Sequence, residues 1–267
     1  MQFVDFIRVA IFFGVAYYFY RLEEKSLAWS RKTPVNERRQ HNIIIVLSNT
    51  IIARITFGAW PIFLAYYCSK ANIGILYLLP IPAIIHFIFT FLILDLLVYG
   101  QHVAFHKISV IWPVHAPHHS DPDLDFTTGL RFHLFEILIS FLLKSLTVVV
   151  LGLQPAGVLV FEILLNAGSV FNHSNIKLSP KVHDVISGWI VTPQMHRVHH
   201  SKIKAEADKN FGFTITLWDK LFGTYMYKSM SQLADQSIGL PQQRKKTMDF
   251  TLQEFLLMPF KFWSKYE

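Results

Sequence analysis

Histidines are the residues of this chain whose type and spacing could do chemistry, and many of them gather in three short groups. The first is H-V-A-F-H, in which His102 and His106 are four residues apart, so that on a helix both imidazoles share one face. The other two are H-A-P-H-H and H-R-V-H-H, whose first, fourth and fifth residues share a face in the same way. Thr192, as a cap, and Pro193, in the first turn, predict a helix start before the third group, and Pro117 predicts one in the second group. The candidate metal ligands are therefore His102, His106, His115, His118, His119, His196, His199 and His200.

The number of histidines limits the kind of metal site. Cys68 is the only cysteine, so a thiolate metal site is excluded and a metal must be held by imidazole and oxygen. A catalytic zinc ion needs about three protein ligands, so eight or nine histidines are too many for one ion and fit two. Imidazole suits iron, zinc, copper and nickel alike, so spacing alone does not name the metal. The sequence H-E-x-x-H, expected for a hydrolytic zinc site, is absent.

The composition places this site beside a membrane. Hydrophobic residues make up 52% of the chain and charged residues only 16%, against about 25% charged in soluble domains. Lys and Arg exceed Asp and Glu by 25 to 18, but the excess is confined to short polar connections, which indicates membrane orientation and lipid contact rather than nucleic-acid binding. A redox metal pair at bilayer depth is what oxygen-dependent attack on an unactivated C–H bond of a lipid requires.

Apolar runs of suitable length predict the elements that position the histidines. They cover residues 3–20, 43–68, 75–98, 134–153 and 156–171. Since about 20 helical residues cross a bilayer core, we expect an all-α, polytopic membrane bundle of about four or five spans. By the positive-inside rule the basic connection 21–41 is cytoplasmic. Two further crossings, and then a hairpin of two more, bring all the histidine groups and His173 out on the cytoplasmic face, in a polar cap.

The histidine groups and their flanking sequences resemble a known family. These flanks are D-L-L-V-Y-G-Q-H, F-T-T-G-L-R-F-H-L-F-E, F-N-H-S-N, T-P-Q-M-H-R-V-H-H-S, K-N-F-G and W-D-K-L-F-G-T. Together they resemble the fatty acid hydroxylase/sterol desaturase superfamily of integral-membrane non-haem di-iron oxygenases, over roughly residues 38–225. The resemblance implies two iron ions, O2 as co-substrate, and electrons from a separate reductase, cytochrome or ferredoxin. It matches the eight histidines to the metal ligands and adds His173 as a ninth.

The resemblance also gives an organisation and two departures. We expect a single membrane-embedded domain over residues 1–267, in which 1–37 hold the first span and a basic connection, 38–225 the catalytic region, and 226–267 a C-terminal tail with an interfacial stretch. Val103 stands where the family often has Arg, and Leu134 replaces the usual Pro after R-x-H. Neither departure touches a ligand, so both bear on packing or substrate shape.

Four polar residues are predicted to contact and orient the ligand histidines without binding the metal: Asp95, His133, Asp208 and Asn210. Asp95 lies two helical turns before His102 and could accept a hydrogen bond from the second nitrogen of a ligand, which would fix its tautomer. The alternative is that Asp95 pairs with Arg54 in the neighbouring span. His133 could instead be a ligand or a helix-start contact, and Asp208 and Asn210 could instead shape a turn.

The predicted function is hydroxylation of a C–H bond of a membrane lipid, which could be sterol-like, fatty acyl, sphingoid or ether lipid. Desaturation by the same site is the alternative. A non-catalytic metal-binding or metal-transport protein ranks below both, because only Arg54, His86 and Asp95 offer titratable groups inside the spans. Arg131 and Glu136 are expected to pair near the membrane surface for structural reasons. The sequence leaves the lipid, the electron donor and the oligomeric state open.

Overall fold

The computed structural model describes residues 2–56, 60–240 and 252–263. In this part of the chain, strand pairing is limited to isolated bridges, so the fold is all-α, as predicted. The helices are α1 (Gln2–Lys25), α2 (Val35–Thr56), α3 (Trp60–Ala71), η1 (Ile75–Leu78), α4 (Ala83–Lys107), α5 (Trp112–His119), η2 (Thr128–Leu130), α6 (Leu134–Leu151), α7 (Pro155–His173), α8 (Pro180–Ile186), α9 (Pro193–His199), α10 (Lys204–Ala207), α11 (Leu217–Leu221), α12 (Met230–Ala234) and α13 (Leu252–Trp263).

Among the described residues, three helices are long and apolar enough to cross a membrane: α4, α6 and α7. The predicted third span and the predicted hairpin are therefore present as helices, and they support an integral, multi-pass protein. The expected count of four or five is not reached by length and composition. The predicted first span forms α1, which carries charged residues toward both ends, and the predicted second span is divided between α2 and α3 on either side of residues 57–59.

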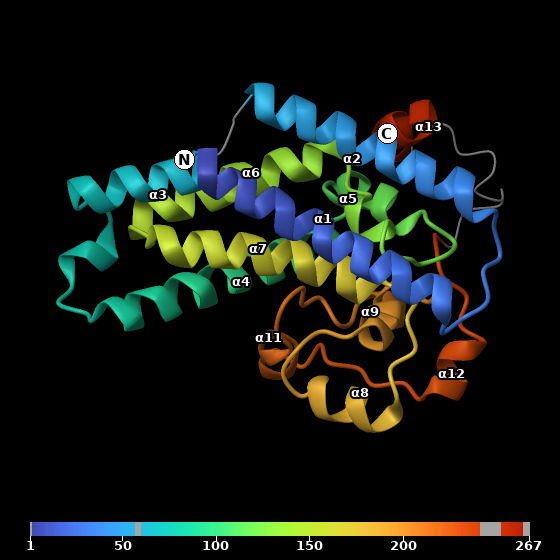
Figure 1. The fold of residues 1–267 in the computed structure, drawn as a ribbon. Coiled ribbons are helices and arrows are strands. Elements are labelled where there is room, and N and C mark those ends of the chain that lie inside the picture. Colours follow the sequence, from blue (N-terminus) through green and yellow to red (C-terminus); the bar gives the residue numbers. More distant parts are fainter. Residues whose placement is uncertain (1, 57–59, 241–251, 264–267) are drawn as a thin grey trace.

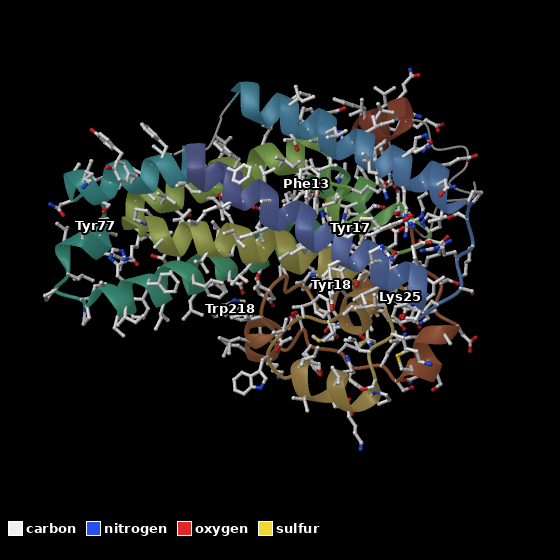
Figure 2. All side chains as sticks on the ribbon, in the orientation of Figure 1. Phe13, Tyr17, Tyr18, Lys25, Tyr77 and Trp218 are labelled. Carbon is white, nitrogen blue, oxygen red and sulfur yellow. The ribbon has the colours of Figure 1, made fainter. Side chains whose placement is uncertain are left out.

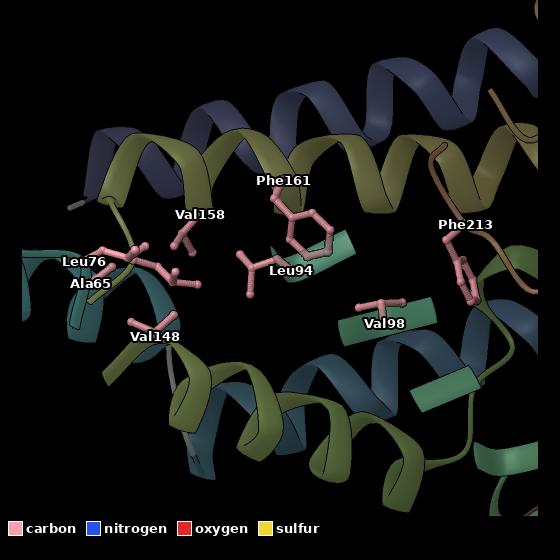
Figure 3. Packing of buried hydrophobic residues seen from close by; sticks show 9 residues of the cluster. Ala65, Leu76, Leu94, Val98, Val148, Val158, Phe161 and Phe213 are labelled. Atoms are coloured by element: carbon pink, nitrogen blue, oxygen red, sulfur yellow. The ribbon is translucent and has the colours of Figure 1, made fainter. Parts of the chain in front are cut away.

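The long helices pack lengthwise around one apolar core. Helix α7 contacts α1, α3 and α4, while α6 contacts α3 and α4 (Figure 1). Leu94, Val158 and Phe161 lie at the centre of the core, between α4 and α7 (Figure 3). The outer surface of α1 carries exposed aromatic side chains, including Phe13, Tyr17 and Tyr18 (Figure 2). Apolar side chains thus fill the centre of the bundle and also cover its outside, as a lipid environment requires.

Helices α8, α9, α11 and α12 form a cap on one side of the bundle, where α9 packs against α7 (Figure 1). Helix α4 runs on without a break from its apolar part to Lys107 and so carries the first histidine group, as predicted. Helix α9 begins at Pro193 with the Thr192 side chain accepting a hydrogen bond from the Met195 amide, again as predicted. The predicted helix start at Pro117 is wrong, because α5 already begins at Trp112, with Pro113 in its first turn.

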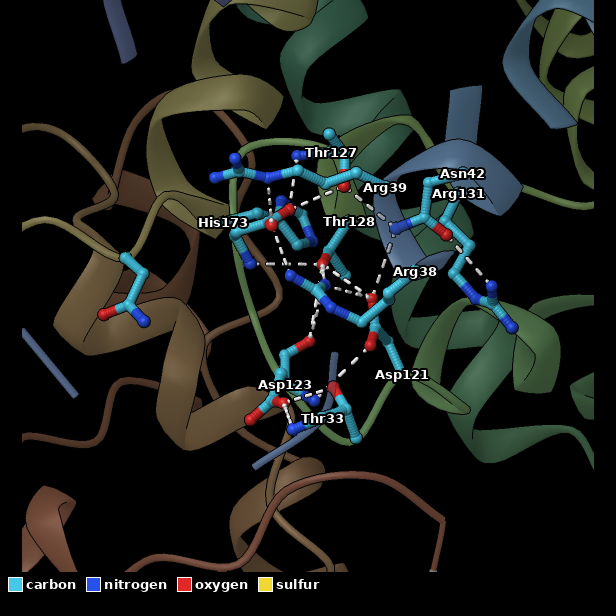
Figure 4. Close-up of polar contacts among 12 residues, drawn as sticks. Thr33, Arg38, Arg39, Asn42, Asp121, Asp123, Thr127, Thr128, Arg131 and His173 are labelled. Carbon is cyan, nitrogen blue, oxygen red and sulfur yellow. Dashed lines mark hydrogen bonds and ion pairs between the residues drawn. The ribbon is translucent and has the colours of Figure 1, made fainter. Parts of the chain in front are cut away.

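A buried network of ion pairs attaches α1 and α2 to the loop after α5, and the sequence patterns did not reveal it. Arg38 Nη1 lies 2.9 Å from Asp121 Oδ2, and the other Arg38 amino group pairs with Asp125 (Figure 4). Arg39 joins Asp125 to Glu23 at the end of α1. Because both arginines and these carboxylates are buried, the network fixes the loop that joins α5, with its histidine group, to η2.

Candidate metal centre

The structure brings all nine predicted histidines together in two adjoining groups, and every one of them is buried. Within each group the possible ligand nitrogens lie within 4.8 Å of one another. The first group (site A) comprises His102, His106, His115, His119 and His199; the second (site B) comprises His118, His173, His196 and His200. Each site is thus assembled from helices far apart in sequence.

Site A lies between the end of α4, α5 and α9. Its ring nitrogens converge, with His102 Nε2 3.1 Å from His115 Nε2, and His106 Nε2 3.1 Å from His119 Nε2. The Nε2 atom of His199 is buried and has no hydrogen-bond partner. A metal ion among these atoms would satisfy it.

Site B joins α5, α7 and α9. His173, at the end of α7, is its centre: its Nε2 lies 3.0 Å from His118 Nε2, 2.9 Å from His196 Nε2 and 3.2 Å from His200 Nε2. The two sites adjoin, because the rings of His119 and His200 stack with their centroids 4.4 Å apart. His173, which the resemblance adds as a ninth ligand, therefore lies among histidines of the second and third groups.

The close approach of these nitrogens is not explained by hydrogen bonds between the rings. His118 Nδ1 contacts the Arg131 carbonyl at 3.2 Å and His173 Nδ1 contacts the Ser169 carbonyl at 2.7 Å. A carbonyl only accepts, so each Nδ1 carries the hydrogen and a neutral ring then has a bare lone pair at Nε2. Two lone pairs 3.0 Å apart repel each other unless a cation lies between them. Two nitrogens bound at right angles to a metal, each at about 2.1 Å, are separated by about 3 Å, so the arrangement fits metal binding.

Burial also keeps the rings in the form that binds metal. Loss of solvent lowers the pKa of His115, His118 and His119 well below the usual value, and the neighbouring imidazoles lower it further. The same causes lower the pKa of His196 and His200, while burial lowers that of His199 to about 3. Neutral imidazole is the metal-binding form, so these side chains are ready to coordinate at neutral pH.

Comparison with known proteins agrees with this arrangement. The profile of the family described as fatty acid hydroxylase matches residues 87–224, which is just over half of the chain and spans all three histidine groups. The chain belongs to the fatty acid hydroxylase family. No solved structure matches it significantly.

Three relatives show the range of this fatty acid hydroxylase family. The ornithine lipid hydroxylase OlsE of Rhizobium tropici is 32% identical over 128 residues, which cover 48% of this chain and 38% of the relative. Human alkylglycerol monooxygenase is 29% identical over 51% of this chain and 29% of its own length, and human cholesterol 25-hydroxylase is 26% identical over 52% and 50%. The chain thus matches half or less of the length of each relative. These relatives are lipid hydroxylases and monooxygenases, which are oxidoreductases.

Among the predicted supporting residues of this family member, Asp208 lies beside a ligand candidate. One of its carboxylate oxygens is 3.7 Å from His106 Nδ1, and the other is 2.8 Å from Lys107 Nζ. At 3.7 Å this contact is longer than a hydrogen bond, so Asp208 lies beside His106 but forms its close ion pair with Lys107.

Glu136 supports a histidine that the sequence interpretation had not connected with it. Its Oε1 lies 2.9 Å from His115 Nδ1, and both side chains are buried. The expected pair with Arg131 does not form; Arg131 instead donates to Asn42 and Ser120. Glu136 lies three residues after His133 in the quoted F-T-T-G-L-R-F-H-L-F-E, so the motif contained the signal, but only the fold shows that the α6 start faces α5.

Asp95 acts differently from the prediction. Its carboxylate accepts a hydrogen bond from Trp218 Nε1 at 2.8 Å, while His102 Nδ1 bonds the Phe211 carbonyl at 2.7 Å. The segment between Asn210 and α11 therefore lies between Asp95 and the ligand candidate, which explains why the two do not meet. The alternative partner, Arg54, has a side chain outside those described.

For His133 and Asn210 the alternative roles are found, since within the described part of the chain neither forms a hydrogen bond with a histidine of site A or B. His133 caps α6 by accepting from the Phe135 amide, and its Nε2 lies 3.2 Å from the Leu256 carbonyl of α13. Asn210, in the left-handed region at φ 53°, donates to the Met195 and Met226 carbonyls and so shapes a turn. This turn carries the Lys209 carbonyl to His199 Nδ1 at 2.9 Å.

Gly129 is a further residue that the sequence interpretation missed. A Cβ atom at this position would lie 2.3 Å from the Ser169 carbonyl oxygen, the same atom that accepts from His173 Nδ1. The Ser169 hydroxyl in turn donates to the Gly129 carbonyl at 2.8 Å. The absence of a side chain at Gly129 lets η2 pack against α7 where α7 holds His173.

Proposed function

We propose that the chain is an iron- and oxygen-dependent hydroxylase of a membrane lipid. The observation that carries this proposal is the pair of buried imidazole sites at the ends of the spanning helices α4 and α7, in a chain of the fatty acid hydroxylase family. Two sites, with five and four histidines, call for two metal ions. The eight histidines of the three groups and His173 are the proposed ligands. This reading also disfavours a metal transporter, because the ligands lie at one end of the bundle and not along it.

Iron suits this ligand set and, when bound, supplies the activation of dioxygen that attack on an unactivated C–H bond requires. The chain itself contributes geometry. Backbone carbonyls hold the Nδ1 atoms of His102, His118 and His173, so the opposite nitrogens point inward. Glu136 holds His115 in the same way with a carboxylate, which makes that imidazole a stronger donor. Burial of the whole cluster excludes water, so reactive species are kept from side reactions.

The substrate class follows from location. The first group lies on α4, only a few residues beyond its apolar part, so a lipid can reach the sites from the bilayer. The relatives are named for ornithine lipid, alkylglycerol and cholesterol, which differ in chemistry and leave a membrane lipid as the shared class. All three names denote hydroxylation or monooxygenation, which favours hydroxylation over desaturation.

The membrane face and the electron donor can be inferred as well. We infer that the histidine sites face the cytoplasm; the positive charge of the connection between α1 and α2 supports this by the positive-inside rule. Electrons come from a separate reductase, cytochrome or ferredoxin partner. The division into residues 1–37, 38–225 and 226–267 stays a prediction, although α13 packs against α5 and so joins the tail to the site region.

The proposal is tested with the purified full chain in lipid nanodiscs. Iron-loaded protein, a chemical reductant and isotopically heavy dioxygen are supplied with lipid extracts from the source membrane, and products are examined by mass spectrometry. The expected result is a lipid that gains one heavy oxygen atom, only with iron, reductant and dioxygen present. Loss of two hydrogens without oxygen gain would indicate desaturation, and turnover with zinc alone would overturn the iron assignment.

A further inference from the structure

The cap carries an exposed apolar surface on its α8 and α11 side. Trp189 is 77% exposed, Val185 70% and Leu221 65%, which are high values for large apolar side chains. The same surface includes Val182, Ile190, Leu217 and Phe222, all of them exposed. We call these seven residues the α8–α11 face. Contiguous apolar surface of this kind marks a contact with a protein or a membrane.

The two segments that form the α8–α11 face are bonded to each other. The Thr216 amide donates to the Trp189 carbonyl at 3.0 Å, and Lys220 Nζ donates to the Gly188 carbonyl at 2.6 Å. Ile190 also forms an isolated bridge with Ile215. Leu217 and Leu221 are four residues apart and so lie on one side of α11. The two segments therefore present their apolar side chains together.

Helix α11 is held against the apolar part of the spanning helix α4. Trp218 Nε1 donates to Asp95, and Figure 2 shows Trp218 between the two helices. Next to this bond, the rings of Tyr99 and Phe222 stack with centroids 5.6 Å apart. Asp95 lies seven residues before His102, or about 10 Å along the helix toward the middle of the bilayer. Helix α11 thus lies below the level of the first histidine group, beside the membrane part of α4 (Figure 1).

We propose that the α8–α11 face is immersed in the boundary between lipid headgroups and acyl chains. An interfacial apolar surface typically lies about 5–10 Å deep in that boundary, which agrees with the position of α11 along α4. Three lysines around the face, Lys177 before α8, Lys181 on α8 and Lys220 on α11, outnumber the one exposed acid of α8, Asp184, and fit contact with anionic headgroups. A soluble protein partner is disfavoured, because it would have to reach beside α4 where the bilayer already lies.

Hydrogen bonds connect the immersed helix α11 to site A. The Asp219 carboxylate of α11 accepts from the Phe211 and Gly212 amides, both at 2.8 Å. The carbonyl of Phe211 in turn holds His102 Nδ1. The bilayer surface, through α11 and this short segment, thereby sets the height of site A above the acyl chains. The proposed immersion does not depend on the identity of the metal or on the reaction.

The test measures the depth of single labels in the full chain reconstituted in vesicles of phosphatidylcholine and phosphatidylglycerol. Cys68 is the only cysteine and is buried, so the unmodified chain serves as the label-free control. Leu221→Cys places a fluorescent nitrobenzoxadiazole label on the face, and Ser231→Cys places the same label on α12, an exposed part of the cap away from it. Trp189→Cys is a second position on the face, in case Leu221→Cys does not fold.

Nitroxide groups on the acyl chains are expected to lower the emission of the face labels at least twofold, while aqueous iodide has little effect on them. The Ser231 label is expected to show the reverse. Equal access of iodide to the labels at Leu221 and Ser231 would overturn the proposal. Protection of the face labels from both quenchers would also overturn it, because that outcome indicates a protein contact.

Discussion

His115 Nδ1 lies 2.9 Å from Glu136 Oε1, and this bond joins the middle histidine group to the start of the spanning helix α6. Both residues are buried, and the other oxygen of Glu136 has no hydrogen-bond partner. Within the described part of the chain, the only hydrogen bond of the Glu136 carboxylate is therefore the one that holds the ring of His115. A histidine ligand whose other ring nitrogen donates to a carboxylate keeps one tautomer and one ring orientation.

Glu136→Gln is expected to weaken metal retention and activity by about 10- to 100-fold, the usual cost of losing such a partner. The amide has the same shape but accepts the Nδ1 hydrogen bond less strongly. Metal remaining after timed exposure to a chelator measures the effect. Glu37→Gln, at an exposed position of α2, is the matched control and should retain metal like the parent. Identical retention in Glu136→Gln and the parent would remove the supporting role of Glu136.

Gly129→Ala is expected to disturb site B. The added methyl would meet the Ser169 carbonyl oxygen, so η2 or α7 must shift, at a cost of about 1–3 kcal/mol in stability. Since the same oxygen holds His173, metal bound by site B should be lost more easily. Gly14→Ala in α1 has nothing within 4 Å of the new atom and should be neutral or slightly stabilising. Thermal unfolding and metal retention of both variants check this; equal behaviour would contradict it.

Arg38→Ala is expected to lower the free energy of unfolding by about 3–5 kcal/mol, because it leaves the buried Asp121 without its ion-pair partner and the buried Asp125 with Arg39 alone. The loop between α5 and η2 should loosen with them. Arg21→Ala, at an exposed position on α1, should leave stability nearly unchanged. Thermal unfolding in detergent compares the two variants, and a loss no larger for Arg38 than for Arg21 would show that the network is not structural.

Glu23 gives a prediction about pH. Burial and the neighbouring Asp125 raise the pKa of Glu23 from 4.5 to about 7, although Arg39 opposes the shift. A raised carboxyl pKa means that the folded state favours the protonated form, so this contribution to stability is full below about pH 4.5 and is lost as the pH rises through about 7. Glu23→Gln should remove this loss, which amounts to about 3 kcal/mol at most. Between about pH 5 and about pH 8, the unfolding temperature of the parent should fall further than that of Glu23→Gln. Parallel changes in the two proteins would contradict the assignment.

Local patterns in the sequence predicted much of the fold and of the site. Apolar runs located α4, α6 and α7 because lipid-facing helices need long apolar stretches. Helical spacing predicted which imidazoles share a face, and Thr192 with Pro193 marked the start of α9. The nine predicted histidines do meet in the structure.

Contacts between distant segments were beyond these patterns. Asp95 was expected at His102 from spacing along one helix, but Trp218, more than a hundred residues later, takes its hydrogen bond. Glu136 was assigned to the nearest opposite charge in sequence, whereas the fold places it at His115. Such partners depend on how helices pack, which a pattern within one helix does not contain.

The central claim, that the histidine groups hold two iron ions, is tested most directly by measuring the metal content of the parent and of two histidine variants. The full chain, purified after growth with iron, is analysed for bound metals by mass spectrometry, alongside His196→Ala and His41→Ala. The proposal predicts close to two iron atoms per chain in the parent and in His41→Ala. In His196→Ala it predicts that iron content falls clearly and that lipid hydroxylation is lost. Zinc as the only metal in the active parent protein, or equal iron content in both variants, would contradict it.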